Sequence, residues 1–403
     1  MTQDRTATEA GTEAGAGYQV EPAEVRYAQE LAFLAAYDPG PRPPGWRLTP
    51  AAVVTFVMGS GGDRLSLETN TATAAGASDG RPPATLEISP KFVGDRALVE
   101  RAVVTLAGER GLLLVGEPGT AKSMLSELLA AAISGNGGLV VQGTAGTNEE
   151  QLRYGWNYAL LLAKGPCPEA LVPSPLLTAM RQGAIARVEE VTRCLPEVQD
   201  ALVSIMSDRR LAVPELDGPA GVVLARDGFN LIATANLRDR GVSEMSAALK
   251  RRFNFEVVPP IAELDAEVAL VRHQAAAALA RHRRTLAVDD AVLEALVTAF
   301  RDLRAGRAVE GWQVERPTTV LSTAEAVGVA TSLGIQAAYL GGRAADPLSL
   351  LPGYLLGVVR KDDPADQGRL LGYWDTAVRR RAEDGGGRLW RRLYELRHVL
   401  AEG

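Results

Sequence analysis

The clearest chemistry in the sequence lies in an eight-residue loop, residues 116–123, which reads GEPGTAKS. This is the spacing GxxxxGK[ST] of a P-loop, with Ala121 in the place of the second glycine. Backbone N–H groups of such a loop and of the helix that follows form a concave anion site. Lys122 can reach the β- and γ-phosphates of ATP, and the Ser123 hydroxyl can bind Mg²⁺. The predicted nucleotide-binding residues are Gly116, Glu117, Pro118, Gly119, Thr120, Ala121, Lys122, Ser123 and Met124.

The elements around the loop decide how specific this signal is. Taken alone, the string also fits a glycine-rich turn between a strand and a helix that contains Lys-Ser by chance. However, residues 111–115 (GLLLV) have the pattern of a buried strand, and residues 122–133 repeat apolar side chains at helical spacing. These neighbours favour the P-loop. Ala121 keeps a small side chain there, but it requires a negative φ or some strain.

A P-loop also needs a carboxylate at the end of a neighbouring strand. Residues 184–190 read AIARVEE, a strand that Arg187 interrupts and two carboxylates follow. Glu189 stands where Asp is usual, and we predict that it serves Mg²⁺ together with Ser123, through water. Glu190 is then placed to polarise the attacking water. The alternative is a solvated Glu-Glu pair at the end of a strand.

Two further signals follow along the chain. Asn236 ends a strand predicted over residues 229–235, where it can hold the attacking water or sense the γ-phosphate, although Asn often just makes a turn there. Arg252, with Arg251 as the second candidate, follows a short predicted helix, residues 242–249. An arginine there can stabilise the transferring phosphoryl group on a neighbouring subunit's ATP. A basic helix C-terminus is the alternative for both arginines.

The surrounding elements predict the fold that must position these residues. Strands over residues 111–115, 139–142, 184–189 and 229–235 alternate with helices, which predicts a parallel sheet covered on both faces. The fold class is therefore α/β, a P-loop core followed by an all-helical lid and a helical C-terminal extension. Lys122, Glu190, Asn236 and Arg252 occur in the order of the AAA+ class of P-loop ATPases. The later helices are predicted over 262–283, 288–304, 318–341 and 366–401.

Four segments resemble the MoxR branch of AAA+ ATPases: GEPGTAKS, residues 196–215, residues 233–241 (ATANLRDRG) and residues 245–256 (MSAALKRRFNFE). The resemblance is close over residues 91–260 and loose over the lid. It implies an ATP- and Mg²⁺-dependent ring, usually a hexamer, with the site roles given above. It also implies chaperone-like maturation or remodelling of a protein partner, commonly one with a von Willebrand factor A domain. The family's arginine near the start of the third lid helix is not obvious; Arg316 is a candidate, but Pro317 after it shifts its geometry.

The organisation of the chain is predicted as four parts. They are an N-terminal extension (1–90) with about 17 disordered residues and a linker (59–85), the AAA+ core (91–260), the lid (261–345) and a C-terminal extension (346–403). The core carries a long insert, residues 143–183, with Tyr154, Trp156 and Tyr158. These aromatic residues either face the pore or a partner or, as we favour, pack under a surface hairpin. Residues 209–227 are predicted to form a second hairpin with Asp217-Gly218 at its tip.

Composition limits the other functions. Two Cys and three scattered His among 403 residues exclude a disulfide scaffold, a zinc cluster and a histidine triad. A net charge of −6 argues weakly against nucleic acid, and the arginine-rich tail is favoured as a solvated helix face. No segment of about 18 apolar residues and no signal peptide are evident, so no membrane role is expected and the expected compartment is the cytoplasm. The leading function is an ATP-driven remodelling ATPase; a nucleotide-gated scaffold with little hydrolysis and a DNA-directed motor are the alternatives.

Overall fold

The central sheet has five parallel strands, and it confirms the predicted fold class. The computed structural model describes residues 20–67, 82–236, 243–280, 282, 288–340, 346–385 and 387–402. Along the sheet the order is β11-β3-β10-β7-β4. The sequence pattern did not indicate the edge strand β11. The strands are β3 (Gly111–Gly116), β4 (Val140–Gln142), β7 (Ile185–Glu189), β10 (Asn230–Asn236) and β11 (Phe253–Val257).

Helices cover both faces of this sheet because its strands are apolar on both faces. On β3, Leu112 and Leu114 belong to a core shared with helices α4 and α5, whereas Leu113 and Val115 belong to a core shared with α8 and α9. This alternation is the two-residue period of a strand. The helices are α4 (Arg96–Ala107), α5 (Lys122–Ser134), α8 (Pro175–Gln182), α9 (Pro196–Asp208) and the short α10 (Ala247–Lys250).

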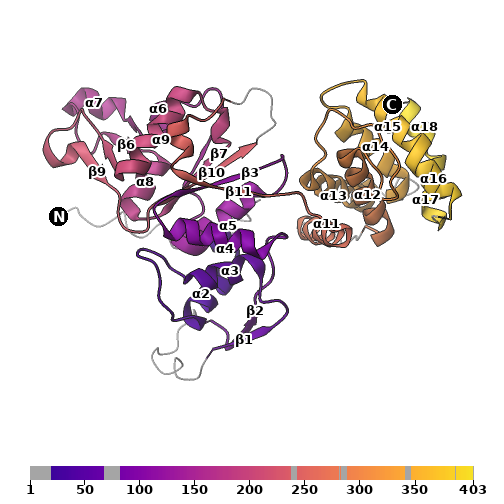
Figure 1. The fold of residues 1–403 in the computed structure, drawn as a ribbon, viewed down its shortest axis with the longest axis horizontal. Helices are drawn as coiled ribbons and strands as arrows, with labels where there is room; N and C mark the ends of the chain where they lie inside the picture. Colours follow the sequence, from indigo (N-terminus) through magenta and orange to yellow (C-terminus); the bar gives the residue numbers. More distant parts are fainter. Residues whose placement is uncertain are drawn as a thin grey trace.

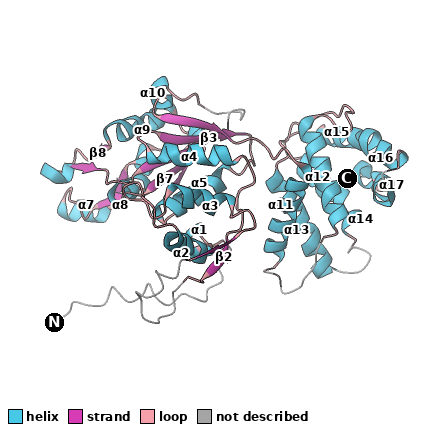
Figure 2. Ribbon diagram, turned by 60° about the horizontal axis from the view of Figure 1, so that its bottom comes forward, coloured by secondary structure: helices cyan, strands magenta, loops and turns pink. Residues whose placement is uncertain are grey.

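The N-terminal residues pack onto the lobe that contains the sheet. Phe33 and Phe56 are fully buried in the core that also contains Leu129 of α5. Figure 2 shows the N-terminal helices α1, α2 and α3 beneath α5. The prediction of a linker over residues 59–85 is wrong in part, because β1 lies within it and pairs antiparallel with β2. Residues 68–81 of that linker, and the predicted disordered residues 1–17, lie outside the described residues. The elements are α1 (Ala23–Arg26), α2 (Ala28–Tyr37), α3 (Pro50–Met58), β1 (Arg64–Ser66) and β2 (Thr85–Glu87).

Two hairpins extend from the core. In the first, the rings of Tyr154 and Trp156 meet edge to face with centroids 5.9 Å apart, whereas Tyr158 is exposed. The second, predicted over residues 209–227, is confirmed by the antiparallel pairing of β8 with β9. The elements are α6 (Glu149–Leu152), β5 (Tyr154–Trp156), α7 (Tyr158–Lys164), β6 (Leu171–Pro173), β8 (Arg210–Ala212) and β9 (Val222–Leu224), with 3₁₀ turns Val191–Arg193 and Gly218–Gly221.

The rest of the chain is a helical lobe, joined to the sheet by the segment after β11 (Figure 1). Leu333, before the predicted division at residue 345, and Leu355, after it, belong to the same hydrophobic core. The helix predicted over 366–401 is divided, with a π-helical turn at Trp374–Val378. Within the described residues, none of the helices is both long and apolar enough to cross a membrane. The helices are α11 (Leu264–Leu279), α12 (Asp290–Ala305), α13 (Thr323–Leu340), α14 (Pro347–Val359), α15 (Asp366–Tyr373), α16 (Arg379–Glu383), α17 (Gly387–Glu395) and α18 (Arg397–Glu402).

Candidate functional site: a P-loop nucleotide site

The predicted P-loop joins the end of β3 to the start of α5, as the strand and helix patterns require. The ammonium group of Lys122 is buried under the loop and donates to the carbonyl oxygens of Gly116 (3.1 Å) and Glu117 (2.7 Å). Gly119 has φ +76°, and Ala121 has φ +64° as the N-cap of α5. Ala121 therefore takes the strained alternative, because its Cβ disfavours the left-handed region that glycine adopts freely.

A buried carboxylate lies next to the first turn of α5. Glu189, at the end of β7, accepts hydrogen bonds from the hydroxyls of Ser123 (2.7 Å), Ser126 (2.6 Å) and Thr234 (2.7 Å). Burial raises the pKa of Glu189, but these hydrogen bonds and the charge of Arg187 outweigh it, so its pKa lies below the ordinary value. The structure therefore brings together Ser123 and Glu189, the two residues predicted to serve Mg²⁺.

Arg187, which interrupts the strand pattern, is part of the same cluster. Its guanidinium donates to Glu189 Oε1 (2.8 Å), Ser126 Oγ (2.9 Å) and the carbonyl oxygens of Ser123 (2.9 Å) and Gly137 (2.7 Å). The side chains of Arg187 and Glu189 are only 8% and 6% exposed, so the charges are paired in a dry environment. The arginine thus fixes the carboxylate against α5, a role that the strand pattern did not indicate.

Asn236 and Glu190, the two residues predicted to act on the γ-phosphate and the attacking water, lie at the ends of strands β10 and β7. Asn236 is buried and is the register partner of Gly116, at the start of the P-loop. Glu190 has φ +52°, and its backbone N–H donates a hydrogen bond to Thr234 Oγ1 (2.9 Å). The Glu190 carboxylate pairs with Arg193 at 2.6 Å, and the Glu190 side chain is one third exposed. Sheet register thus places Asn236 beside the loop, while Glu190 follows Glu189 in the chain.

The two arginines predicted to act on a neighbouring subunit lie outside the pocket of this chain. Arg251 is exposed at the C-cap of α10. Arg252 is partly buried, and its guanidinium donates to Ser207 Oγ of α9 and to the carbonyl oxygen of Ala248. Neither lines the pocket beside the P-loop. Their roles stay predictions.

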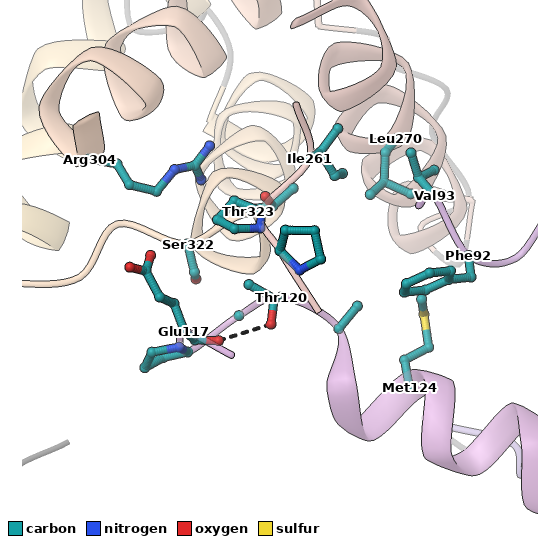
Figure 3. A pocket seen from close by; sticks show the side chains of 15 residues that line it. Phe92, Val93, Glu117, Thr120, Met124, Ile261, Leu270, Arg304, Ser322 and Thr323 are labelled. Atoms are coloured by element: carbon teal, nitrogen blue, oxygen red, sulfur yellow. Dashed lines mark hydrogen bonds between the residues drawn. The ribbon is translucent and has the colours of Figure 1, made fainter. Parts of the chain in front are cut away.

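A pocket lies between the P-loop and the helical lobe, and residues of both line it. Figure 3 shows the phosphate loop on one side and the lid residues on the other. Six predicted binding residues line it: Glu117, Pro118, Gly119, Thr120, Ala121 and Met124.

Other lining residues were not predicted from the sequence, because they come from segments that only the fold brings together. They are Phe92, Val93, Pro259, Pro260, Ile261, Leu270, Arg304, Ser322 and Thr323.

The residues present fit a Mg·nucleotide ligand. The pocket has an apolar wall, which includes Phe92 and Leu270 and suits a base, beside a loop that suits phosphates. Ser123 and Glu189 offer the hard oxygen donors that Mg²⁺ prefers. Within the described residues, no group of three His, Cys, Asp or Glu could hold a metal. Mg²⁺ commonly needs only one or two protein groups when it also binds substrate phosphates.

Comparisons with known proteins agree with this fold. Residues 111–253 match the AAA domain of the dynein-related subfamily. Residues 265–401 match the C-terminal domain of YehL-like AAA+ ATPases, which spans both the predicted lid and the predicted C-terminal extension.

YehL of Escherichia coli K12, itself described as uncharacterized, is 47% identical over 382 residues, 95% of this chain and 98% of YehL. The chain belongs to the YehL-like family of AAA+ ATPases. The matched family models name AAA+ and YehL, not the MoxR branch.

More distant similarities are weaker. The uncharacterized protein SH1500 of Staphylococcus haemolyticus is 27% identical over 48% of this chain and 68% of its own length. A putative ATPase from Cytophaga hutchinsonii has a TM-score of 0.35 at 16% identity, over 53% of this chain and 60% of that chain. NtrX from Brucella abortus in complex with ADP has a TM-score of 0.41 at 16% identity, over 76% of this chain and 69% of that chain.

The arginine-rich tail is largely occupied by internal contacts. Arg379 pairs with Glu383, Arg392 with Asp346 and Arg397 with Asp375. Arg381 is buried and pairs with Asp302 and Glu310. Leu393 and Leu400, in the same tail, are buried. Arg379, Arg392 and Arg397 are about half exposed, as a solvated helix face requires, whereas the buried Arg381 departs from that prediction.

Proposed function

We propose that this chain binds and hydrolyses ATP with Mg²⁺, and that it is a MoxR-like motor that remodels or matures a protein partner. In this proposal Lys122 and the loop amides bind phosphates, and Ser123 and Glu189 hold the metal. The metal would supply positive charge that offsets the charge of the phosphates. Glu190 would accept a proton from the attacking water, and Asn236 would orient that water or the γ-phosphate.

One observation carries the ATPase part of the proposal. The hydroxyl that follows Lys122 is hydrogen-bonded to the buried carboxylate at the end of a neighbouring strand, Ser123 Oγ to Glu189 Oε2 at 2.7 Å. P-loop ATPases use such a pair to hold Mg²⁺. The cluster is assembled from α5, β7 and β10, so its geometry depends on the sheet order and not on local sequence alone.

Steady-state ATP turnover tests this proposal directly. Wild type is compared with Glu190→Gln, which keeps the size of the side chain but cannot take a proton, and with Lys122→Ala. Glu190→Gln should bind a fluorescent ATP analogue as wild type does and lose about 100-fold or more in turnover. Lys122→Ala should lose binding. Equal turnover of wild type and Glu190→Gln would contradict the role of Glu190, and wild type that binds no nucleotide would overturn the ATPase.

A nucleotide-gated scaffold is the second candidate. Ala121 is strained at the loop, and the Glu190 carboxylate is engaged by Arg193 in an ion pair. Both features are compatible with tight binding and slow hydrolysis. Tight ATP binding with negligible turnover, even when the partner is present, would favour this candidate over the motor.

The assembly and partner belong to the same proposal. We expect a ring of identical chains, a hexamer by analogy with the resembled family, acting in the cytoplasm without a membrane or nucleic-acid role. The expected partner is a protein with a von Willebrand factor A domain. Light scattering in ATP, and turnover with and without such a protein from the same genome, measure these two expectations. A monomer in ATP, or a rate that such a protein leaves unchanged, would contradict them.

A further inference from the structure

A lid arginine that the sequence did not single out lines the P-loop pocket, and it lies at the end of the helix predicted over residues 288–304. Arg304, in the last turn of α12, lines the pocket together with Glu117 and Thr120 of the loop. Figure 3 shows it on the lid side of the pocket. Arg316, the candidate suggested by the sequence, is exposed and lines a neighbouring hollow instead.

A buried carboxylate holds Arg304 in this position. Glu267 of α11 is fully buried, and its Oε2 accepts from Arg304 Nη2 at 3.0 Å. The same carboxylate accepts from Arg301 Nη1 (3.0 Å) and from the Thr323 hydroxyl (2.6 Å). Two guanidinium groups therefore share one carboxylate, and this cluster keeps a net positive charge beside the pocket. Thr323 begins α13, where the resembled family has its arginine.

Arg304 is also linked to the lid residue that touches the P-loop. Its Nη1 donates to the carbonyl oxygen of Leu321 (3.4 Å). The next residue, Ser322, lies so close to Gly119 that a Cβ on that glycine would be 2.1 Å from the Ser322 Cβ. The cationic cluster and the phosphate loop are thus joined through two consecutive lid residues.

We propose that Arg304 is the lid residue that binds the phosphates of the nucleotide, and that Glu267 positions it. An arginine suits this role because its planar fork of N–H groups matches phosphate oxygens and always carries charge. The inference rests on the proposed function and deepens it, by assigning the lid contact to α12 and not to the start of α13.

Equilibrium binding of ATPγS to the purified full-length chain tests the assignment. The variants are Arg304→Ala, Arg304→Lys, Glu267→Gln and the rival Arg316→Ala. Arg272→Ala is the matched control, because Arg272 is a lid arginine that pairs with Asp290 and lies outside the pocket lining. A thermal melt of each variant shows whether the lid remains folded.

Arg304→Ala should weaken ATPγS binding about tenfold or more, which is about 1.4 kcal/mol. Arg304→Lys should lose less because it keeps the charge, and it remains informative if the alanine variant does not fold. Glu267→Gln should also lose less than Arg304→Ala, whereas Arg272→Ala and Arg316→Ala should bind as wild type does.

Three results would overturn the assignment while the proposed function stands, because wild type would still bind ATPγS. The first is unchanged ATPγS affinity of Arg304→Ala, and the second is a loss of affinity in Arg316→Ala instead. The third is an equal loss of affinity in Arg304→Ala and Glu267→Gln at equal melting temperatures, which would mean that Arg304 has only a structural role. Wild type that fails to bind ATPγS would instead overturn the proposed function itself.

Discussion

Arg187 and Glu189, two residues apart on strand β7 of the central sheet, form a buried ion pair with 2.8 Å between Nη2 and Oε1. Side chains at i and i+2 of a strand point to the same face, which allows this contact. Removing one partner of a buried pair leaves an uncompensated charge. The pair therefore ties the carboxylate proposed for Mg²⁺ to the stability of the sheet.

Glu189→Gln should lower the free energy of unfolding at pH 7 by about 3 kcal/mol, because Arg187 loses its ionised partner. Urea unfolding measures the change. Glu190→Gln is the matched control, since its ion pair with Arg193 is exposed and should contribute within about 1 kcal/mol. Equal losses in the two variants would show that burial of the pair does not matter.

The same pair predicts a pH dependence. The pKa of Glu189 lies below its ordinary 4.5 in the folded chain. Its contribution to stability is therefore complete above about pH 4.5 and is lost as the pH falls through the lowered pKa. The difference in unfolding free energy between wild type and Glu189→Gln should narrow below pH 4.5. A difference that widens in acid would contradict the direction of the shift.

Ala121→Gly should stabilise the chain, because glycine relieves the left-handed backbone at φ +64°. We expect a gain of about 0.5–1 kcal/mol in the free energy of unfolding, measured by urea or thermal unfolding. The control is the same change at Ala132, inside α5, which should cost about 1 kcal/mol. A loss at both positions would mean that the loop is not strained at Ala121.

The P-loop was predictable because strand, loop and helix are contiguous, so eight residues carry the signal. Other parts of the site depend on distant segments. Phe92 and Arg304 line one pocket although they are far apart in the sequence, and no local pattern marks either. Arg187 looked like an interruption of a strand, since the sequence does not show that a carboxylate two residues later is buried beside it.

The N-terminal helices support the pocket through one buried lysine. Lys91 Nζ pairs with Glu30 and lies over the rings of Tyr27 (4.8 Å) and Phe56 (4.4 Å). Burial lowers the pKa of Lys91, and the hydrogen bond and charge of Glu30 partly offset this. Phe92, the next residue, lines the nucleotide pocket. The contacts of Lys91 with Glu30, Tyr27 and Phe56 thus hold the backbone next to Phe92.

Lys91→Met should lower the free energy of unfolding by about 2–3 kcal/mol, because it removes a buried, charged hydrogen-bond donor. It should also weaken ATPγS binding, because Phe92 loses its anchor. The control is Arg96→Ala, whose ion pair with Glu100 is exposed and should contribute within about 0.5 kcal/mol. If a folded Lys91→Met variant binds ATPγS with wild-type affinity, then the contacts of Lys91 do not support the nucleotide pocket.

Arg252 is the site residue that a single chain cannot test. Its guanidinium is held by Ser207 and Ala248 outside the pocket, so any contact with ATP requires a second copy. Arg252→Ala should therefore bind ATPγS as wild type does and lose about 100-fold or more in turnover. Arg251→Ala, changed at the exposed neighbour, tests the second candidate in the same two assays.

Mixing separates action between subunits from a structural effect. A Lys122→Ala subunit cannot bind ATP but still carries Arg252, so it can complete the site of an Arg252→Ala neighbour. The mixture should recover part of the turnover that each variant lacks alone, in proportion to the fraction of mixed neighbours. If both variants are folded and co-assemble, as light scattering would show, and turnover stays absent, then Arg252 does not act between subunits.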